Sequence, residues 1–240
     1  MVAYIKYLYF CHIDFVAMKN FELIRNAVTD IDGNIYDAVN INNKLWLASN
    51  LRVTRLNNGT PLGGYVESEL GKLPYFEYPF NLTSKSSKFP KYGLHYNFEA
   101  VNTGLLAPNG WRVTSINDWT ELLTFLGKSE HNLNKEEMRP YLAHTAKAIC
   151  SNNGWLKSDV ENSVGRNAET NNETNLNLYP NGYSINTKNP LGITSHLWCS
   201  DEYQDSDEYT WFIRIWHKGA NVVGAFGARA LAMGVRCVKC

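Results

Sequence analysis

Three short segments at the C-terminal end, rich in aromatic and β-branched residues, constrain the fold of this chain more than any other feature. They span residues 196–203, 211–216 and 234–238, and polar turns separate them. Such composition with short spacing is typical of β-strands. The sequence therefore predicts that the chain ends in an antiparallel meander of three strands.

The middle segment also predicts a surface that faces solvent. Side chains alternate between the two faces of a strand, so Trp211 shares one face with Ile213 and Ile215, which is suited to a core. The opposite face presents two large aromatic side chains and one cation, which a strand does not need in order to fold. These three residues are Phe212, Arg214 and Trp216.

Composition favours a folded chain and argues against nucleic-acid binding. Of the 240 residues, 44% are hydrophobic and 19% are charged, so a sizeable core is expected. Lys and Arg number 23 and so do Asp and Glu, which gives a formal net charge of zero. A nucleic-acid partner would require a basic excess or a basic stripe, and the sequence has neither. Aromatic residues make up 13% of the chain, which suits either large core rings or stacking on sugars and peptides.

The remaining segments predict short antiparallel sheets, two helices and long irregular loops. Asp32 and Gly33 separate two alternating segments and indicate a hairpin. A calcium loop that started at Asp30 would place its closing ligand at Ile41, which offers no oxygen, so a turn is the better interpretation. A second turn precedes a strand at 45–47.

Two helices and a long loop region follow. Ser115 and Asp118 approximate a capping box before an apolar stripe that ends at Gly127. A second helix is expected over 141–150. Residues 151–190 are rich in Asn, Thr and Gly without periodicity, which favours a functional loop region.

The cysteines and the first residues fit no standard pattern. Five scattered cysteines match no zinc site, so no metal or cofactor is expected. Cys199 and Cys237 would form a disulfide if their strands were neighbours, but buried free thiols are the default expectation.

The segment at residues 4–18 is too short and too polar to span a bilayer, and it suggests either a degenerate export signal or a misassigned start. We therefore expect an N-terminal extension over 1–27 and a single domain over 28–240, without a transmembrane segment.

Several motifs together resemble the Fibrobacter succinogenes major paralogous domain. Two of them are Leu106-Ala-Pro-Asn-Gly-Trp-Arg-Val113 and Leu178-Tyr-Pro-Asn-Gly-Tyr183. The others lie, in family order, at 30–36, 45–51, 92–97, 118–119, 153–155, 198–200 and 235–238. The resemblance implies a fold of the α+β class, a C-type-lectin-like domain that is related in shape to formylglycine-generating enzymes and found mostly in secreted or surface-attached bacterial proteins. The chain departs from the family in lacking a clean lipoprotein signal and in carrying Cys199 where Ser is usual.

No motif indicates catalysis, and the function is expected to be binding. The calcium-binding strings of sugar-binding C-type lectins, the cysteine pair of formylglycine-generating enzymes and hydrolase motifs are all absent from the sequence. The sequence and the resemblance lead us to expect a non-catalytic binding or adhesion domain of the cell surface or a phage, extracellular or in the cell envelope. It would recognise a glycan or a protein through the C-terminal sheet and loops. The alternatives are a pilus or envelope assembly module and, less favoured, a formylglycine-generating type of enzyme. The candidate ligand-binding residues are Tyr203, Phe212, Arg214, Trp216, His217, Lys218, Asn221 and Phe226.

Overall fold

A computed structural model describes residues 21–64, 72–127, 145–185, 187–188 and 190–240 of the protein. Its first hairpin joins β1 (Glu22–Thr29) to β2 (Ile35–Ile41). Within the turn, one carboxylate oxygen of Asp30 accepts the backbone N–H groups of Asp32 and Asn34 at 3.0 and 2.9 Å, which confirms the predicted turn. β1 begins ahead of the expected domain boundary at residue 28, so part of the predicted extension belongs to a sheet.

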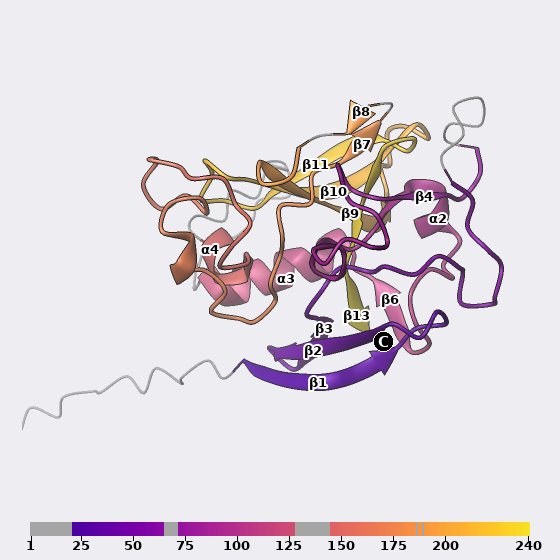
Figure 1. The fold of residues 1–240 in the computed structure, drawn as a ribbon, viewed down its shortest axis with the longest axis horizontal. Helices are drawn as coiled ribbons and strands as arrows, with labels where there is room; N and C mark the ends of the chain where they lie inside the picture. Colours follow the sequence, from indigo (N-terminus) through magenta and orange to yellow (C-terminus); the bar gives the residue numbers. More distant parts are fainter. Residues whose placement is uncertain (1–20, 65–71, 128–144, 186, 189) are drawn as a thin grey trace, which may run out of the picture.

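The hairpin continues into a five-stranded sheet that contains both the first and the last strand. Asn42 and Asn43 adopt positive φ angles of 51° and 61°, which form a tight turn before β3 (Lys44–Leu47). β13 (Cys237–Lys239) lies between β3 and β6 (Trp111–Val113) and runs antiparallel to both. The order is β1-β2-β3-β13-β6, and Figure 1 shows this sheet at the lower edge.

The eight-stranded sheet corrects the predicted meander. β9 (Thr194–Glu202), β10 (Tyr209–Trp216) and β11 (Val223–Ala228) are consecutive antiparallel neighbours. The expected third strand at 234–238 is divided instead. β12 (Ala232–Val235) pairs parallel with β9 on its other edge, and β13 belongs to the five-stranded sheet.

Beyond β12, the eight-stranded sheet is completed by very short strands. β5 and β4 follow β12, while β7 pairs with both β12 and β8. The bounds are β4 (Phe76–Glu77), β5 (His95–Asn97), β7 (Ser184–Ile185) and β8 (Thr187–Lys188).

The main helix, α3 (Ile116–Gly127), lies between the two sheets and matches its predicted bounds. The capping box is present, because the Asp118 backbone N–H donates to the Ser115 hydroxyl at 3.1 Å and the Ser115 N–H donates to the Asp118 carboxylate at 2.8 Å. Leu122 and Leu123 are buried in a cluster that also contains residues of β2, β3, β9 and β10. The helix thereby joins the two sheets into one core.

The other helices are short. Of the second predicted helix, residues 141–144 lie outside the described residues, and α4 (Ala146–Ile149) forms the remainder. α1 (Phe89–Tyr92), α2 (Phe98–Asn102) and the 3₁₀ helix η2 (Ala168–Thr170) complete the helical elements of the described residues. The described residues between 151 and 190 are largely irregular, as expected. In the part of the chain that the structure describes, no helix has the length and apolarity needed to cross a bilayer.

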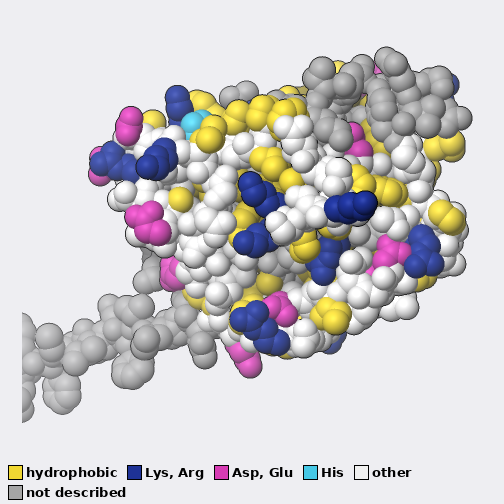
Figure 2. Space-filling model, in the orientation of Figure 1, with side chains coloured by type: hydrophobic (Ala, Val, Ile, Leu, Met, Phe, Trp, Pro, Cys, Tyr) yellow, Lys and Arg dark blue, Asp and Glu magenta, His cyan; other side chains and the backbone are white. Residues whose placement is uncertain are grey.

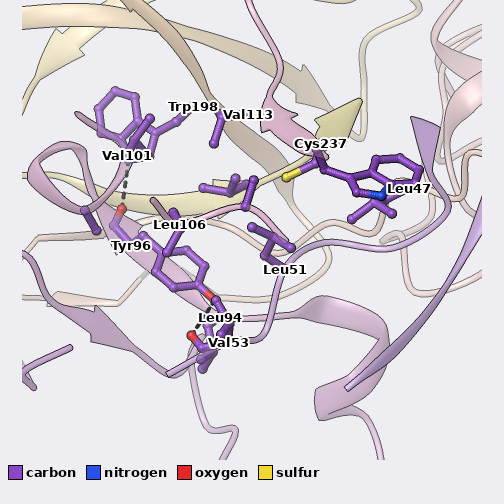
Figure 3. Packing of buried hydrophobic residues seen from close by; sticks show 14 of the residues in the cluster. Leu47, Leu51, Val53, Leu94, Tyr96, Val101, Leu106, Val113, Trp198 and Cys237 are labelled. Atoms are coloured by element: carbon purple, nitrogen blue, oxygen red, sulfur yellow. Dashed lines mark hydrogen bonds between the residues drawn. The ribbon is translucent and has the colours of Figure 1, made fainter. Parts of the chain in front are cut away.

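A second buried cluster fills the space under β5, β9 and β12, and Figure 3 shows its centre. The indole N–H of Trp198 donates to the Tyr96 carbonyl at 2.8 Å, and the Tyr96 hydroxyl donates to the Val53 carbonyl at 2.8 Å. These bonds satisfy the polar ends of two fully buried rings, which would otherwise lose hydration without compensation. The cluster anchors the base of β9 and so fixes the surface described next.

Candidate functional site

An open pocket of about 580 Å³ lies over one face of β9 and β10. Strand pairing places Thr194 opposite Trp216, His196 opposite Arg214 and Trp198 opposite Phe212. Because paired residues point to the same face, these side chains form a contiguous surface. We call the cavity the β9–β10 pocket. Its lining consists of Tyr183, Ile193, Thr194, His196, Phe212, Arg214, Trp216, Phe226, Gly227, Leu231 and Met233.

The small residues of β11 leave room for this pocket. Gly227 is buried beside the Phe212 ring, and a Cβ placed on it would come within 2.9 Å of the Phe212 Cε1 atom. Real Cβ atoms essentially never come so close to another atom, so glycine at this position allows the Phe212 ring to approach the backbone of β11. Ala225, opposite Phe212 in the β10–β11 ladder, is similarly small.

The floor of the β9–β10 pocket is a neutral histidine between two aromatic rings. The His196 ring centroid is 4.6 Å from that of Tyr183 and 5.5 Å from that of Phe212. Burial, reinforced by the charges of Arg214 and His95, lowers the pKa of His196 from 6.5 to about 3. Its Nδ1 atom is buried and has no hydrogen-bond partner in the described part of the chain. At neutral pH this imidazole is uncharged and retains unused hydrogen-bonding capacity.

Arg214 and Trp216 form the exposed rim. The Trp216 side chain is 47% exposed, and the Lys218 ammonium lies 5.9 Å from the centroid of its ring. Arg214 is also exposed, and within the described residues its guanidinium makes no hydrogen bond or ion pair. The rim therefore combines a flat apolar surface with an available cation.

The predicted outward face of β10 is only partly exposed. Arg214 and Trp216 face solvent as expected, and Ile213 and Ile215 are buried on the other side. Phe212 is buried, with 7% exposure, which corrects the prediction. The reason is that both faces of this end of the sheet are covered, so Phe212 packs against Trp198 with ring centroids 6.0 Å apart.

His217, another of the candidate ligand-binding residues, is buried and does not line the β9–β10 pocket. It is 8% exposed, its backbone N–H donates to the Ile193 carbonyl, and its carbonyl accepts from the Gly165 N–H. Lys218 is exposed and Asn221 is half-buried, and neither belongs to the lining of the β9–β10 pocket.

The rings of the two remaining candidates pack on the opposite face of β10. Tyr203 stacks on Phe226 with ring centroids 4.4 Å apart and an interplanar angle of 16°. Phe226 also contacts Tyr209 and Trp211 edge to face. We call these four residues the aromatic cluster. Hydrophobic side chains are visible along the upper edge in Figure 2, where Figure 1 places β10 and β11.

Sequence reasoning missed most of the pocket. The unforeseen lining residues come from β9, the segments before it, β11, β12 and the connection between these two strands. They are Tyr183, Ile193, Thr194, His196, Gly227, Leu231 and Met233. Alternation along β9 places Thr194, His196 and Trp198 on one face, but only the register with β10 shows that this face adjoins Arg214 and Trp216.

The described residues do not assemble a metal centre. No group of three or more His, Cys, Asp or Glu side chains within them is arranged to hold a metal ion. Cys199 and Cys237 are free, fully buried thiols that belong to different core clusters. Burial raises the pKa of both thiols, so they stay protonated and unreactive.

Comparison with known proteins gives one match. The sequence model of the Fibrobacter succinogenes major domain matches residues 39–239. Neither a curated protein nor a solved structure matches the chain.

Proposed function

The chain belongs to the Fibrobacter succinogenes major domain family, and from this premise we propose that it is a non-catalytic binding or adhesion domain. It recognises a glycan or a protein through the C-terminal sheet and the loops beside it. We further propose a C-type-lectin-like fold, which is supported by the common sheet of β1 and β13 and by the long irregular segment that leads into β9. As a domain of this type it would act at the bacterial cell surface or in a phage, outside the cell or in its envelope.

The β9–β10 pocket is the observation that carries this proposal. Its volume of about 580 Å³ lies within the roughly 300–1,000 Å³ typical of small-molecule sites. It also joins aromatic surfaces to a few polar groups on rigid strands, which is how specific binding sites are usually built.

The chemistry of the pocket supports binding rather than catalysis. An imidazole with a pKa of about 3, such as His196, is a weak base, and a general base at neutral pH works best with a pKa near 7. The protonated, separated thiols of Cys199 and Cys237 likewise argue against an enzyme of the formylglycine-generating type.

Replacement of Trp216 by alanine tests the proposal. Trp216→Ala should fold normally yet lose binding to a glycan array or to immobilised cell-surface extracts, because the rim would lose its flat apolar surface. Tyr209→Ala is the matched control, since Tyr209 is an exposed aromatic residue on the opposite face of the same strand. Equal binding by wild type and Trp216→Ala would reject the pocket as the binding site.

The aromatic cluster favours a second candidate function, an assembly module. Tyr209 and Phe226 are 39% and 51% exposed, and exposed aromatic groups of this kind are enriched in protein interfaces. If the protein assembles through this surface, Phe226→Ala should lower the mass measured by light scattering, while Trp216→Ala should not.

A further inference from the structure

Some polar and charged side chains of the pocket make no hydrogen bond or ion pair within the described residues, and they indicate the chemical class of the ligand. We propose that the β9–β10 pocket binds a sugar unit that carries a carboxylate, with Arg214 pairing with that carboxylate. The inference rests on the proposed binding function. It adds the chemical class of the ligand, which the family match does not give.

Arg214 differs from the other arginines that the structure describes. Each of the others donates a side-chain hydrogen bond to a carboxylate, an amide oxygen or a backbone carbonyl. Arg214 makes none, although it stands beside a formed cavity on a rigid strand. A planar guanidinium with free N–H groups is suited to bidentate binding of a carboxylate.

The charge of the residues that line the β9–β10 pocket favours a ligand with one negative charge over a polyanion. The described lining contains no Asp or Glu, and the only formal charge on it is Arg214. Lys218 adds a second cation near Trp216 at the rim. Polyanions such as nucleic acids need a row of cations. The pocket and its rim offer Arg214 and Lys218 rather than such a row, so a single carboxylate fits better.

The remaining groups of the pocket match a sugar ring. The hydroxyl groups of Tyr183 and Thr194 make no hydrogen bond within the described residues. Both residues line the β9–β10 pocket together with Phe212 and Trp216. A sugar presents both hydroxyl groups and an apolar ring face, whereas a purely apolar ligand would leave these polar groups unpaired.

The test uses pairs of probes that differ only in the carboxylate. Trigalacturonate is compared with its fully methyl-esterified form, and sialyllactose is compared with its methyl ester as a second source of a sugar carboxylate. Binding of each probe to the full chain is measured by isothermal titration calorimetry. Wild type should bind at least one acidic sugar at least tenfold more tightly than its neutral counterpart.

Two variants test which residues cause the preference for the acidic sugar. Arg214→Gln should reduce the affinity for the acidic sugar to that of the neutral one and leave the neutral affinity within twofold, while Trp216→Ala should weaken both. Arg25→Gln, which removes an exposed arginine on the other sheet, should change neither affinity.

The outcomes separate this inference from the proposed function. If array binding depends on Trp216 but wild type does not prefer acidic sugars, or Arg214→Gln keeps the preference, the carboxylate inference is wrong and the binding function stands. If neither the array nor any probe binds the wild-type chain, both proposals fail.

Discussion

Arg214 lies directly opposite His196 in the antiparallel ladder between β9 and β10. After burial, the charge of Arg214 is the main cause of the lowered pKa of His196. This pair links the proposed ligand contact to the stability of the fold, because the cation at the rim helps to keep the imidazole at the floor uncharged. The next two predictions follow from it.

His196 should make the stability of the protein fall in mild acid. Its pKa is about 3 in the fold against 6.5 for an unperturbed histidine, so the unfolded state binds the proton more readily. The resulting stabilisation is complete above about pH 6.5 and is lost as the pH falls towards 3. Between pH 7 and pH 5, wild type should lose about 2 kcal/mol of unfolding free energy through this residue. Urea titrations of wild type and His196→Gln at both pH values measure the difference, and equal losses in the two proteins would refute the prediction.

Removal of the rim cation should raise the pKa of His196. In Arg214→Gln the imidazole loses one cause of its lowered pKa but remains buried, so its pKa should move only part of the way towards 6.5. Titration of the His196 ring resonances by NMR measures the change. Lys218→Gln serves as the control, because Lys218 is not among the causes of the shift and its replacement should leave the His196 pKa unchanged.

Local patterns in the sequence predicted individual elements well. The Asp30 turn, the strand at 45–47 and α3 formed as expected, because turn residues, capping and periodicity act over a few neighbouring residues. Ile213 and Ile215 were correctly assigned to the core by alternation. These features need no knowledge of distant parts of the chain.

Features that depend on distant residues were missed. β11 consists largely of glycine, alanine and valine, and it becomes a strand through pairing with β10 rather than through its own propensity. Phe212 is buried because it packs beside Trp198 in a cluster that also contains Phe98, which alternation along β10 does not reveal. The pairing of His196 with Arg214 depends on the register between β9 and β10, which the sequence of either strand does not give. The pocket could therefore be predicted only in part.

Asp118→Asn should destabilise the protein markedly. The Asp118 side chain is 2% exposed and lies 2.6 and 2.7 Å from Arg112 and Lys44. Burial alone would raise the pKa of Asp118, but hydrogen bonds from Arg112, Lys44 and Ser115 outweigh burial and hold that pKa far below its usual value. Loss of the charge removes the ion-pair partner of Arg112 within the described residues and leaves Lys44 paired with Glu121 alone, at an expected cost of about 2–4 kcal/mol.

The pH dependence of that loss provides the check. A carboxylate with a lowered pKa stabilises the fold above its unfolded pKa of about 3.8, and the stabilisation disappears as the pH falls below it. The difference in unfolding free energy between wild type and Asp118→Asn should therefore shrink from pH 5 to pH 2. A constant difference would show that Asp118 acts through packing or hydrogen bonding alone.

Arg236→Met should cost more stability than the loss of an exposed arginine. Arg236 is fully buried between β12 and β13, and it donates to the carbonyls of Leu47 and Leu176 and to the side chain of Asn50. Methionine fills similar space but leaves these acceptors unpaired, so we expect a loss of about 3–5 kcal/mol in urea unfolding. Arg25→Met removes an arginine whose side chain is 74% exposed and should cost less than about 1 kcal/mol. Comparable losses in the two variants would contradict the assigned role of Arg236.

Leu122→Ala tests whether α3 joins the two sheets. Leu122 is 3% exposed and packs in the cluster that contains Trp46 of β3 and Ile213 of β10. Truncation leaves a cavity that neither sheet can close without moving the other, so the unfolding free energy should fall by about 2–5 kcal/mol with an unchanged denaturant slope. Thr124→Ala changes an exposed residue of the same helix and should stay within about 0.5 kcal/mol of wild type. Two separate unfolding transitions in Leu122→Ala, or a loss no larger than that of Thr124→Ala, would show that the sheets are not coupled through this helix.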